Sequence, residues 1–393
     1  MFKPWKIYML ALISFLVGTS EYIIAGILDK IAASLDISLV AAGQLITVFS
    51  LVYGLGTPLL IALTARWERR NLLICSLGLF VVANVLAYIL PGFAAFVGAR
   101  VLMALGAGVV VVTALTLAAK IAPSGKQASA IATVIMGFTA SLIVGVPLGR
   151  LVAAAYDWKT VFAGIGALGL LAMFILSVTI PKTEGDAPVP LREQLALLKK
   201  PRILLALSVS FFWLGGYSIA YTYISPYLLT ITGMNEKTLG AALLAFGIAS
   251  LAGSKVGGYS ADKRGVFRTL MAGMTLHVIT LILLSLAAHT PVVVFALLIL
   301  WSFAAWSSGP TQQYNLVTMA PESSGIMLSL NNSVMQLSMA AGAGIGGIIV
   351  GSVSLHAVTW IGASGVAAAI VINYVSFKLS NAQRREAENI QHT

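Results

Sequence analysis

Stretches of about 20 mainly apolar residues recur along the whole chain, and this feature constrains the fold more than any other. A helix of that length crosses the hydrocarbon core of a bilayer. The core offers no water to the backbone, so a crossing segment must be a helix or part of a closed barrel. The short alternating strands of a membrane barrel do not occur in this sequence. We therefore predict twelve transmembrane helices, at residues 5–28, 40–63, 71–90, 95–120, 126–151, 160–180, 202–228, 238–260, 267–288, 292–318, 325–350 and 357–379.

The composition agrees with a chain that is buried in lipid. Of its 393 residues, 59% are hydrophobic and 9% are charged, whereas soluble domains carry about 25% charged residues. A water-soluble fold of this size would lack its charged shell. Cys75 is the only cysteine, which excludes an internal disulfide and a metal site built from several cysteines. We predict an all-α membrane protein without a bound metal.

The net charge of +11 would suggest nucleic acid or acidic lipid as a partner if the chain were soluble. Instead, the basic residues concentrate in every second loop, as the positive-inside rule requires of cytoplasmic segments. We predict that both termini are cytoplasmic, that membrane lipids are partners and that nucleic acid is not. The basic loops hold Lys3, Lys6, Arg66, Arg69, Arg70, Lys120, Lys126, the segment 182–202, Lys263, Arg264, Arg268, Lys378, Arg384 and Arg385.

The chain divides into two similar halves. Gly145 and Gly149 in the fifth span recur as Gly342 and Gly346 in the eleventh, 197 residues later in both cases. Each half holds six spans, an even number, so the halves are parallel repeats related by an axis along the membrane normal. We predict two pseudo-symmetric six-helix bundles. The predicted boundaries are 1–180 for the first bundle, 181–201 for a cytoplasmic linker, 202–380 for the second bundle and 381–393 for a cytoplasmic tail.

Glu21 is the one acidic residue well inside an apolar span. A charged acid at the centre of a membrane helix costs about 2.5–3.5 kcal/mol on insertion scales, so such a residue is a functional candidate. We predict that Glu21 carries protons and that Arg100 in the fourth span is its matching cation. The alternative for both is an extended side chain whose charged end reaches the membrane interface. Arg150 lies closer to the end of its span, and we interpret it as interfacial.

Aromatic and amide side chains gather in the second half. Trp213, Tyr217 and Tyr221 recur every four residues and so form one stripe on a helix. Amides and tryptophans in the middle of a span are difficult to place in lipid. We predict a substrate cavity suited to a planar or amphipathic organic solute, although aromatic belts at the interface give a similar pattern. Its predicted lining is Trp213, Tyr217, Tyr221, Trp306, Gln312, Gln313, Asn331 and Gln336.

These residues resemble the drug–proton antiporter branch of the major facilitator superfamily, in particular its bacterial sugar-efflux and purine-efflux members. The resemblance covers essentially the whole chain. The segment Thr19-Ser20-Glu21-Tyr22 looks like the first-helix signature, and Gly145-Val146-Pro147-Leu148-Gly149 matches the antiporter motif of the fifth span. The similarity to the purine-efflux members in particular rests on Trp306, Pro310-Thr311-Gln312-Gln313, Asn331 and Gln336.

The resemblance implies a monomeric bacterial inner-membrane transporter that is not an enzyme and that works by alternating access. It implies proton-coupled efflux, by antiport, of a small organic solute such as a purine or nucleoside, a sugar or a drug, with multidrug resistance as one outcome. The proton motive force would drive this cycle without a cofactor. Glu21 falls on the protonatable acid of the family, and Arg100 falls on its span-four arginine.

Gating residues are predicted at two places. Gly145 and Gly149 form a small-xxx-small pair that favours close helix packing, and Pro147 between them adds a kink that suits a flexing helix. After the eighth span, the residues from Gly258 to Gly265 keep most of the loop motif of the superfamily. The loop after the second span departs from that motif at Ile61, Ala65 and Glu68. We predict that Asp262, near the start of the fifth span, helps to lock the cytoplasmic side.

Two other classes of function remain open. A proton- or cation-coupled importer has the same fold, and only the first-helix acid and the fifth-span motif favour export. A membrane-embedded sensor or enzyme would need a catalytic cluster or a soluble domain, and the longest polar segment has only about twenty residues. The sequence has no Walker-type glycine loop, so ATP hydrolysis by this chain does not drive transport.

Overall fold

The computed structural model describes residues 5–123, 126–185, 196–320 and 324–391, and the regular structure in this part of the chain is entirely helical. Twelve helical segments there are long and apolar enough to cross a membrane. The predicted fold class, an all-α membrane protein with twelve spans in two six-helix bundles, is confirmed. The boundaries predicted for the bundles, the linker and the tail stay predictions.

The first six spans contain two interruptions that the hydropathy pattern does not predict. The predicted span 5–28 breaks at Ile27, whose backbone leaves the helical region (φ −130°, ψ 20°). The fifth span contains a π-helical turn, η1. The elements are α1 (Trp5–Gly26), α2 (Leu28–Leu35), α3 (Leu39–Leu63), α4 (Arg69–Ile89), α5 (Phe93–Ile121), α6 (Gln127–Ala140), η1 (Ser141–Gly145), α7 (Val146–Ala155) and α8 (Lys159–Thr179).

The last six spans repeat part of this pattern. The predicted span 202–228 ends early, and Tyr223 after it has left the regular helix (φ −107°, ψ 18°). The first helix of each half therefore breaks near the same end, as expected for repeats. The elements are α10 (Pro201–Tyr221), α11 (Ile224–Pro226), η2 (Tyr227–Ile231), α12 (Glu236–Arg264), α13 (Val266–Leu286), α14 (Pro291–Met319), α15 (Ser324–Ser352) and α16 (Ala357–Gln391).

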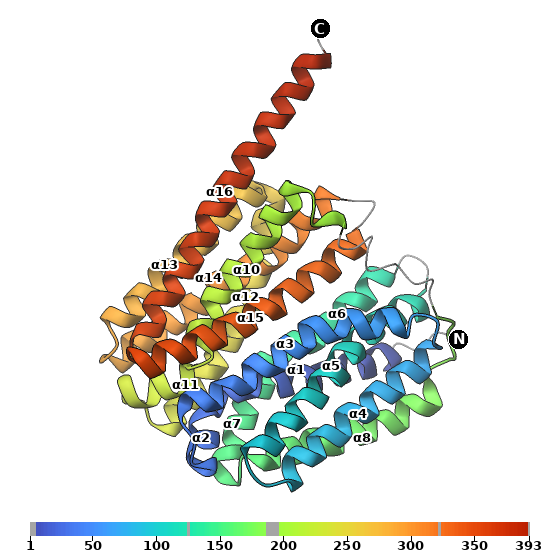
Figure 1. Cartoon of the computed structure of the whole chain (residues 1–393), viewed down its shortest axis with the longest axis vertical. Coiled ribbons are helices and arrows are strands. Elements are labelled where there is room, and N and C mark those ends of the chain that lie inside the picture. The colour runs from blue at the N-terminus through green and yellow to red at the C-terminus, as the bar shows by residue number, and fades with distance from the viewer. Residues whose placement is uncertain (1–4, 124–125, 186–195, 321–323, 392–393) are drawn as a thin grey trace.

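The two bundles lie side by side and meet along two seams (Figure 1). In one seam α3 packs along α15, and in the other α12 packs against η1 and α7. We call the end with the loops 64–68 and 122–126 the basic end, and the end with the loops 156–158 and 287–290 the far end. The last helix, α16, continues to Gln391 and projects beyond the other helices at the basic end (Figure 1).

Pro147 explains the irregular fifth span. It stands in the first turn of α7, directly after the π-helical turn η1. Proline has no N–H to donate and its ring crowds the preceding turn, so a regular helix cannot continue through it undisturbed. A π-turn inserts one extra residue and relieves this conflict. The irregular backbone predicted at Pro147 is therefore present, and its role in gating stays a prediction.

Glu68 connects the start of α4 to the segment after α8. Its carboxylate accepts hydrogen bonds from the backbone N–H groups of Arg70 (2.8 Å), Asn71 (3.3 Å) and Thr183 (2.9 Å). Partial burial would raise the pKa of Glu68, but these N–H groups and the charge of Arg70 outweigh burial and hold the pKa below its usual range. Glu68 is therefore an ionised N-cap at neutral pH. This explains how the loop tolerates an acid where the superfamily motif has glycine.

Candidate functional site

Glu21 of α1 lies between the two bundles and is 3% exposed. One carboxylate oxygen, Oε1, accepts a hydrogen bond from the Nε2 amide of Gln336 on α15, at 3.0 Å. The other oxygen, Oε2, has no hydrogen-bond partner among the described residues. The side chain does not reach the interface, so the alternative of an outward-extended acid does not hold in this conformation. Glu21 therefore has one carboxylate oxygen without a partner in the described structure and one bonded to the opposite bundle.

Arg100 of α5 is fully buried beside Glu21. Its NH1 group donates to the backbone carbonyl of Ser20 at 2.7 Å, and its guanidinium lies 4.0 Å from the ring centroid of Phe49. Its Nε and NH2 groups have no partner in the described part of the chain, and it makes no ion pair with Glu21 there. Arg100 therefore holds the backbone next to the acid and keeps donors free for another anion or acceptor.

The aromatic stripe of α10 is buried within the second bundle. Tyr217 stacks on Tyr221 with 5.0 Å between ring centroids, and its ring also meets Trp301 at 5.5 Å and Trp306 at 6.2 Å. Trp213, Tyr217 and Tyr221 are each at most 5% exposed, so the stripe is not a lipid-facing belt. We call Trp213, Tyr217, Tyr221, Phe246, Trp301 and Trp306 the aromatic cluster.

The aromatic cluster adjoins the acid and carries unused polar atoms. Tyr22, next to Glu21, is within electrostatic range of the hydroxyls of Tyr217 and Tyr221. The indole N–H of Trp213 is buried without a hydrogen-bond partner among the described residues. The indole N–H of Trp306 and the Tyr217 hydroxyl lie within reach of each other but form no well-aligned hydrogen bond. Buried donors left unpaired cost about 1–3 kcal/mol each. They lie among flat apolar rings, and a role of this cluster in binding a solute stays a prediction.

The predicted amides divide into two groups. Asn331 and Gln336 on α15 are buried and each keeps an unpaired side-chain carbonyl oxygen in the described structure. Gln312 is also buried, but it donates to the Ala206 carbonyl at 2.6 Å and to Ser210 Oγ at 3.2 Å, so its donors are used in packing α14 against α10. Gln313 is exposed. Gln336 therefore lies next to Glu21, whereas Gln312 forms hydrogen bonds inside the second bundle.

The paired glycines make the close helix contacts that their spacing predicts. A Cβ on Gly145 would lie 2.2 Å from Thr19 Oγ1, and one on Gly149 would lie 2.4 Å from Ile23 Cδ1. In the second half, a Cβ on Gly346 would lie 2.8 Å from Tyr223. The fifth span thus packs on the first, and the eleventh packs on the seventh. A gating role for Gly145 and Gly149 remains a prediction.

Four charged side chains join the bundles at the far end, and we call them the far-end latch: Asp29, Lys30, Arg150 and Glu236. Arg150 is 1% exposed, so its interpretation as interfacial is wrong. It donates to both carboxylate oxygens of Asp29, at 2.5 and 2.9 Å, and to Glu236 Oε2 at 2.7 and 2.9 Å. Lys30 completes the latch at 3.0 Å from Glu236. The latch ties α2 and α7 of the first bundle to α12 of the second.

Asp262 lies at the opposite end of the same helix, α12. Its side chain is exposed and has no hydrogen-bond or ion-pair partner in the described part of the chain. The hydrogen bonds and ion pairs found there between the bundles lie at the far end or midway along the helices. The predicted contact near the start of the fifth span stays a prediction. Residues 124 and 125 of that loop lie outside the described residues.

Several residues of the site are not evident from the sequence. The Nε2 atom of His277 on α13 accepts the indole N–H of Trp301 on α14 at 2.7 Å. Trp301 could be found by its place in the same span as Trp306, but Phe246 carries no polar signal. The latch residues lie in three separate segments at span ends, where charges are common. No spacing rule links them.

Two six-helix bundles that meet around a buried acid have the architecture of a secondary transporter. The chain belongs to the Major Facilitator Superfamily, whose family model matches residues 10–343. It is 63% identical to the uncharacterized MFS-type transporter YbcL of Bacillus subtilis (strain 168), over 98% of both chains. It is 31% identical to the inner membrane transport protein YdhP of Escherichia coli (strain K12), over 88% of this chain and 89% of that one.

Among solved structures, the fold is similar to that of a D-xylose–proton symporter, with a TM-score of 0.75, 18% identity, and 93% and 96% of the two chains covered. At that identity the similarity concerns the fold alone. The family and the sequence relatives identify the chain as a twelve-span membrane transporter of a small solute. Members of the superfamily generally need no cofactor and typically work as monomers.

Proposed function

We propose that the chain is a proton-coupled exporter of a small organic solute, and that the basic end with both termini faces the cytoplasm. The positive-inside rule supports this orientation. The far-end latch then closes the outer side, so the structure corresponds to an inward-facing conformation. The first-helix acid and the Gly145–Gly149 motif support antiport, because they resemble the drug–proton antiporter branch.

The observation that carries the proposal is the hydrogen bond between Glu21 and Gln336 across the two bundles. A charged carboxylate only accepts hydrogen bonds, and it does so more strongly than a neutral acid. In the inward-facing conformation Gln336 therefore stabilises the deprotonated acid, which favours release of its proton to the cytoplasm. Movement of α15 away from α1 would leave the charge buried and unpaired, and the acid would then take a proton from outside.

The aromatic cluster and the free amide oxygens of Asn331 and Gln336 would hold the solute beside this acid. The unpaired indole and hydroxyl donors suit acceptor atoms on the solute, and the flat rings suit a planar or amphipathic body. Purines or nucleosides, sugars and lipophilic drugs all offer part of this chemistry. Thermal stabilisation of the purified protein by a panel of these three classes would identify a substrate for transport assays.

Everted membrane vesicles with an acidic interior test the direction of transport. In such vesicles the interior corresponds to the outside of the cell, so an antiporter accumulates the solute as protons leave. A symporter would instead move the solute out together with protons. Accumulation that collapses when the pH gradient is dissipated supports export. Solute exit driven by the same gradient would assign the chain to the importers.

The latch gives a conformational prediction. In Glu236→Gln, Arg150 keeps its pair with Asp29 but loses its partner on the second bundle. Because Glu236 is half exposed, its pairs contribute only about 0.2–1 kcal/mol, so we expect the ratio of outward-open to inward-open molecules to rise by at most about five-fold. Spin labels at the exposed far-end positions Tyr156 and Val292, with Cys75 first replaced, report the distance between the bundles.

The matched control for this measurement is Asp36→Asn, which makes the same charge change at the same end. Asp36 is exposed and has no side-chain partner in the described structure. Its distance distribution should match that of the wild type. An equal shift in both variants would show that the far end responds to overall charge and that the latch does not hold the bundles together.

A change at Asp262 is expected to shift the two conformations in the direction opposite to Glu236→Gln. In the outward-open conformation the basic ends approach, and a carboxylate near the start of the fifth span is favoured by the free N–H groups there, typically by about 0.3–1 kcal/mol when exposed. Asp262→Asn should therefore shift molecules towards the proposed inward-facing form. The same pair of far-end labels measures it, as a gain in the short-distance population. An unchanged distance distribution would show that Asp262 takes no part in gating.

A further inference from the structure

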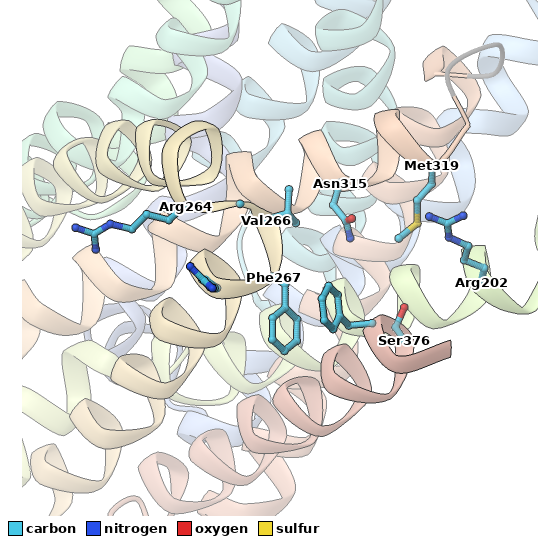
Figure 2. A pocket seen from close by; sticks show the side chains of 10 residues that line it. Arg202, Arg264, Val266, Phe267, Asn315, Met319 and Ser376 are labelled. Atoms are coloured by element: carbon cyan, nitrogen blue, oxygen red, sulfur yellow. The ribbon is translucent and has the colours of Figure 1, made fainter. Parts of the chain in front are cut away.

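A cavity of about 350 Å³ opens at the basic end of the second bundle, away from Glu21 and the aromatic cluster. It lies between the ends of α10, α12, α13, α14 and α16. Three arginines line it: Arg202 at the start of α10, Arg264 at the end of α12 and Arg268 in the first turn of α13. Figure 2 shows Arg202 on one side of the cavity, next to Met319, and Arg264 on the other side, with its guanidinium group directed away from Asn315 and Met319.

The three arginines have no counter-charge in the described part of the chain. No acidic residue lines the cavity, and none of the three has an ion-pair or hydrogen-bond partner among the described residues. Asp262 is the acid nearest to Arg264 in sequence, but it does not line the cavity. Positive charge that lines a cavity without a counter-charge among the described residues favours a bound anion.

The wall of the cavity adds an unused polar group. Ser376 on α16 is 7% exposed, lines the cavity, and makes no hydrogen bond among the described residues. Its hydroxyl is drawn pointing into the cavity between Phe267 and Arg202 (Figure 2). A serine in a helix usually bonds to the carbonyl one turn before it. A free hydroxyl on the Arg202 side of a cavity that Arg268 also lines suits the oxygen of a phosphate, which guanidinium binds in a bidentate manner.

The remaining wall is apolar and leads towards the lipid. Phe267 stacks on Phe377 with 4.0 Å between ring centroids, and Phe377 is 40% exposed. On the same helix, Val371, Tyr374 and Val375 are 42–62% exposed, so this side of α16 is an apolar outer face of the bundle. A ligand with a charged head in the cavity could therefore extend an acyl chain along α16.

We propose that this cavity binds the phosphate head group of an anionic phospholipid from the cytoplasmic leaflet. Basic pockets between helices on the cytoplasmic side suit such head groups. The cytoplasmic placement rests on the proposed orientation, whereas the binding itself is independent of transport. The phosphate links the start of α10 to the α12–α13 turn, so the bound lipid stabilises the basic end of the second bundle.

Binding is tested with the purified full chain in detergent, by thermal unfolding and native mass spectrometry with added phosphatidylglycerol or cardiolipin. We expect saturable binding and a raised unfolding temperature, with phosphatidylcholine giving neither. Replacing Arg202, Arg264 and Arg268 together by glutamine should weaken binding by about ten-fold or more. Ser376→Leu, which fills the cavity without changing the charge, should weaken it as well and provides the readout if the triple variant does not fold.

The control removes three positive charges at the same end but outside the cavity: Arg66→Gln, Lys126→Gln and Lys263→Gln. It should bind anionic lipid as the wild type does. An equal loss of lipid affinity in the control would mean that the lipid is attracted by surface charge in general. Normal lipid affinity in the cavity variants would show that the lipid does not bind in this cavity. Equally strong stabilisation by glycerol 3-phosphate or inorganic phosphate would overturn the assignment to a lipid. None of these readouts uses transport, so failure of the export proposal would leave them unchanged.

Discussion

Glu21→Gln is expected to reduce solute accumulation driven by a pH gradient to the level of protein-free liposomes. The amide has nearly the shape of the acid and is permanently neutral, so it resembles the protonated state. It cannot release a proton on one side and take one up on the other. Proteoliposomes with an imposed pH gradient, supplied from outside with the labelled solute found in the stabilisation screen, measure this effect.

Exchange of labelled for unlabelled solute should survive in Glu21→Gln, because exchange needs no net movement of protons. Survival of exchange also shows that the variant is folded and inserted. Asp36→Asn, which removes an exposed carboxylate, should accumulate solute as the wild type does. Full pH-driven accumulation by Glu21→Gln would overturn the proton-carrier role and leave the fold and the family untouched.

Gln336→Leu provides a second test of proton release by Glu21. It keeps the acid but removes the hydrogen bond from α15. If Gln336 stabilises the deprotonated acid in the inward-facing conformation, its loss should slow proton release and move the pH optimum of transport upward, towards less acidic conditions on the cytoplasmic side. An unchanged pH profile would mean that the hydrogen bond joins the bundles without contributing to coupling.

The spans could be predicted from the sequence because each is a local property. Twenty apolar residues leave few options for the backbone in lipid, so the twelve helices appear where hydropathy places them. The breaks at Ile27 and after Tyr221 lie inside apolar sequence, and hydropathy carries no information about them. The π-helical turn is signalled only indirectly, by Pro147.

The candidate site is predictable where a residue is unusual for its surroundings. Glu21 and Arg100 stand out as charges in apolar spans, and both prove to be buried. The bond from Gln336 to Glu21 joins residues 315 positions apart, so it depends on how the two bundles meet. The error at Arg150 has the same origin. A charge near the end of a span looks interfacial until Asp29 and Glu236 are brought to it by two other helices.

Tyr217→Ala is expected to weaken solute binding by about ten-fold or more. Tyr217 is the centre of the aromatic cluster, in contact with Tyr221, Trp301 and Trp306. Aromatic pairs contribute about 0.5–1.5 kcal/mol each beyond the area they bury, so loss of one or two such contacts with the solute accounts for a change of this size. Equilibrium binding of the solute from the stabilisation screen, with the protein in detergent, measures it.

Truncation of a buried ring also removes packing, so Tyr217→Phe separates binding from folding. The Tyr217 hydroxyl is buried and has no hydrogen-bond partner in the described structure, and its removal should leave the unfolding temperature unchanged or raise it. If the hydroxyl bonds to the solute, affinity should still fall by roughly two- to ten-fold, which is the effect of one hydrogen bond of about 0.5–1.5 kcal/mol. Tyr259→Ala, which removes a ring that is 66% exposed, is the control for general effects of losing a tyrosine. Wild-type affinity in both Tyr217 variants would place the solute elsewhere and make the aromatic cluster a packing core of the second bundle.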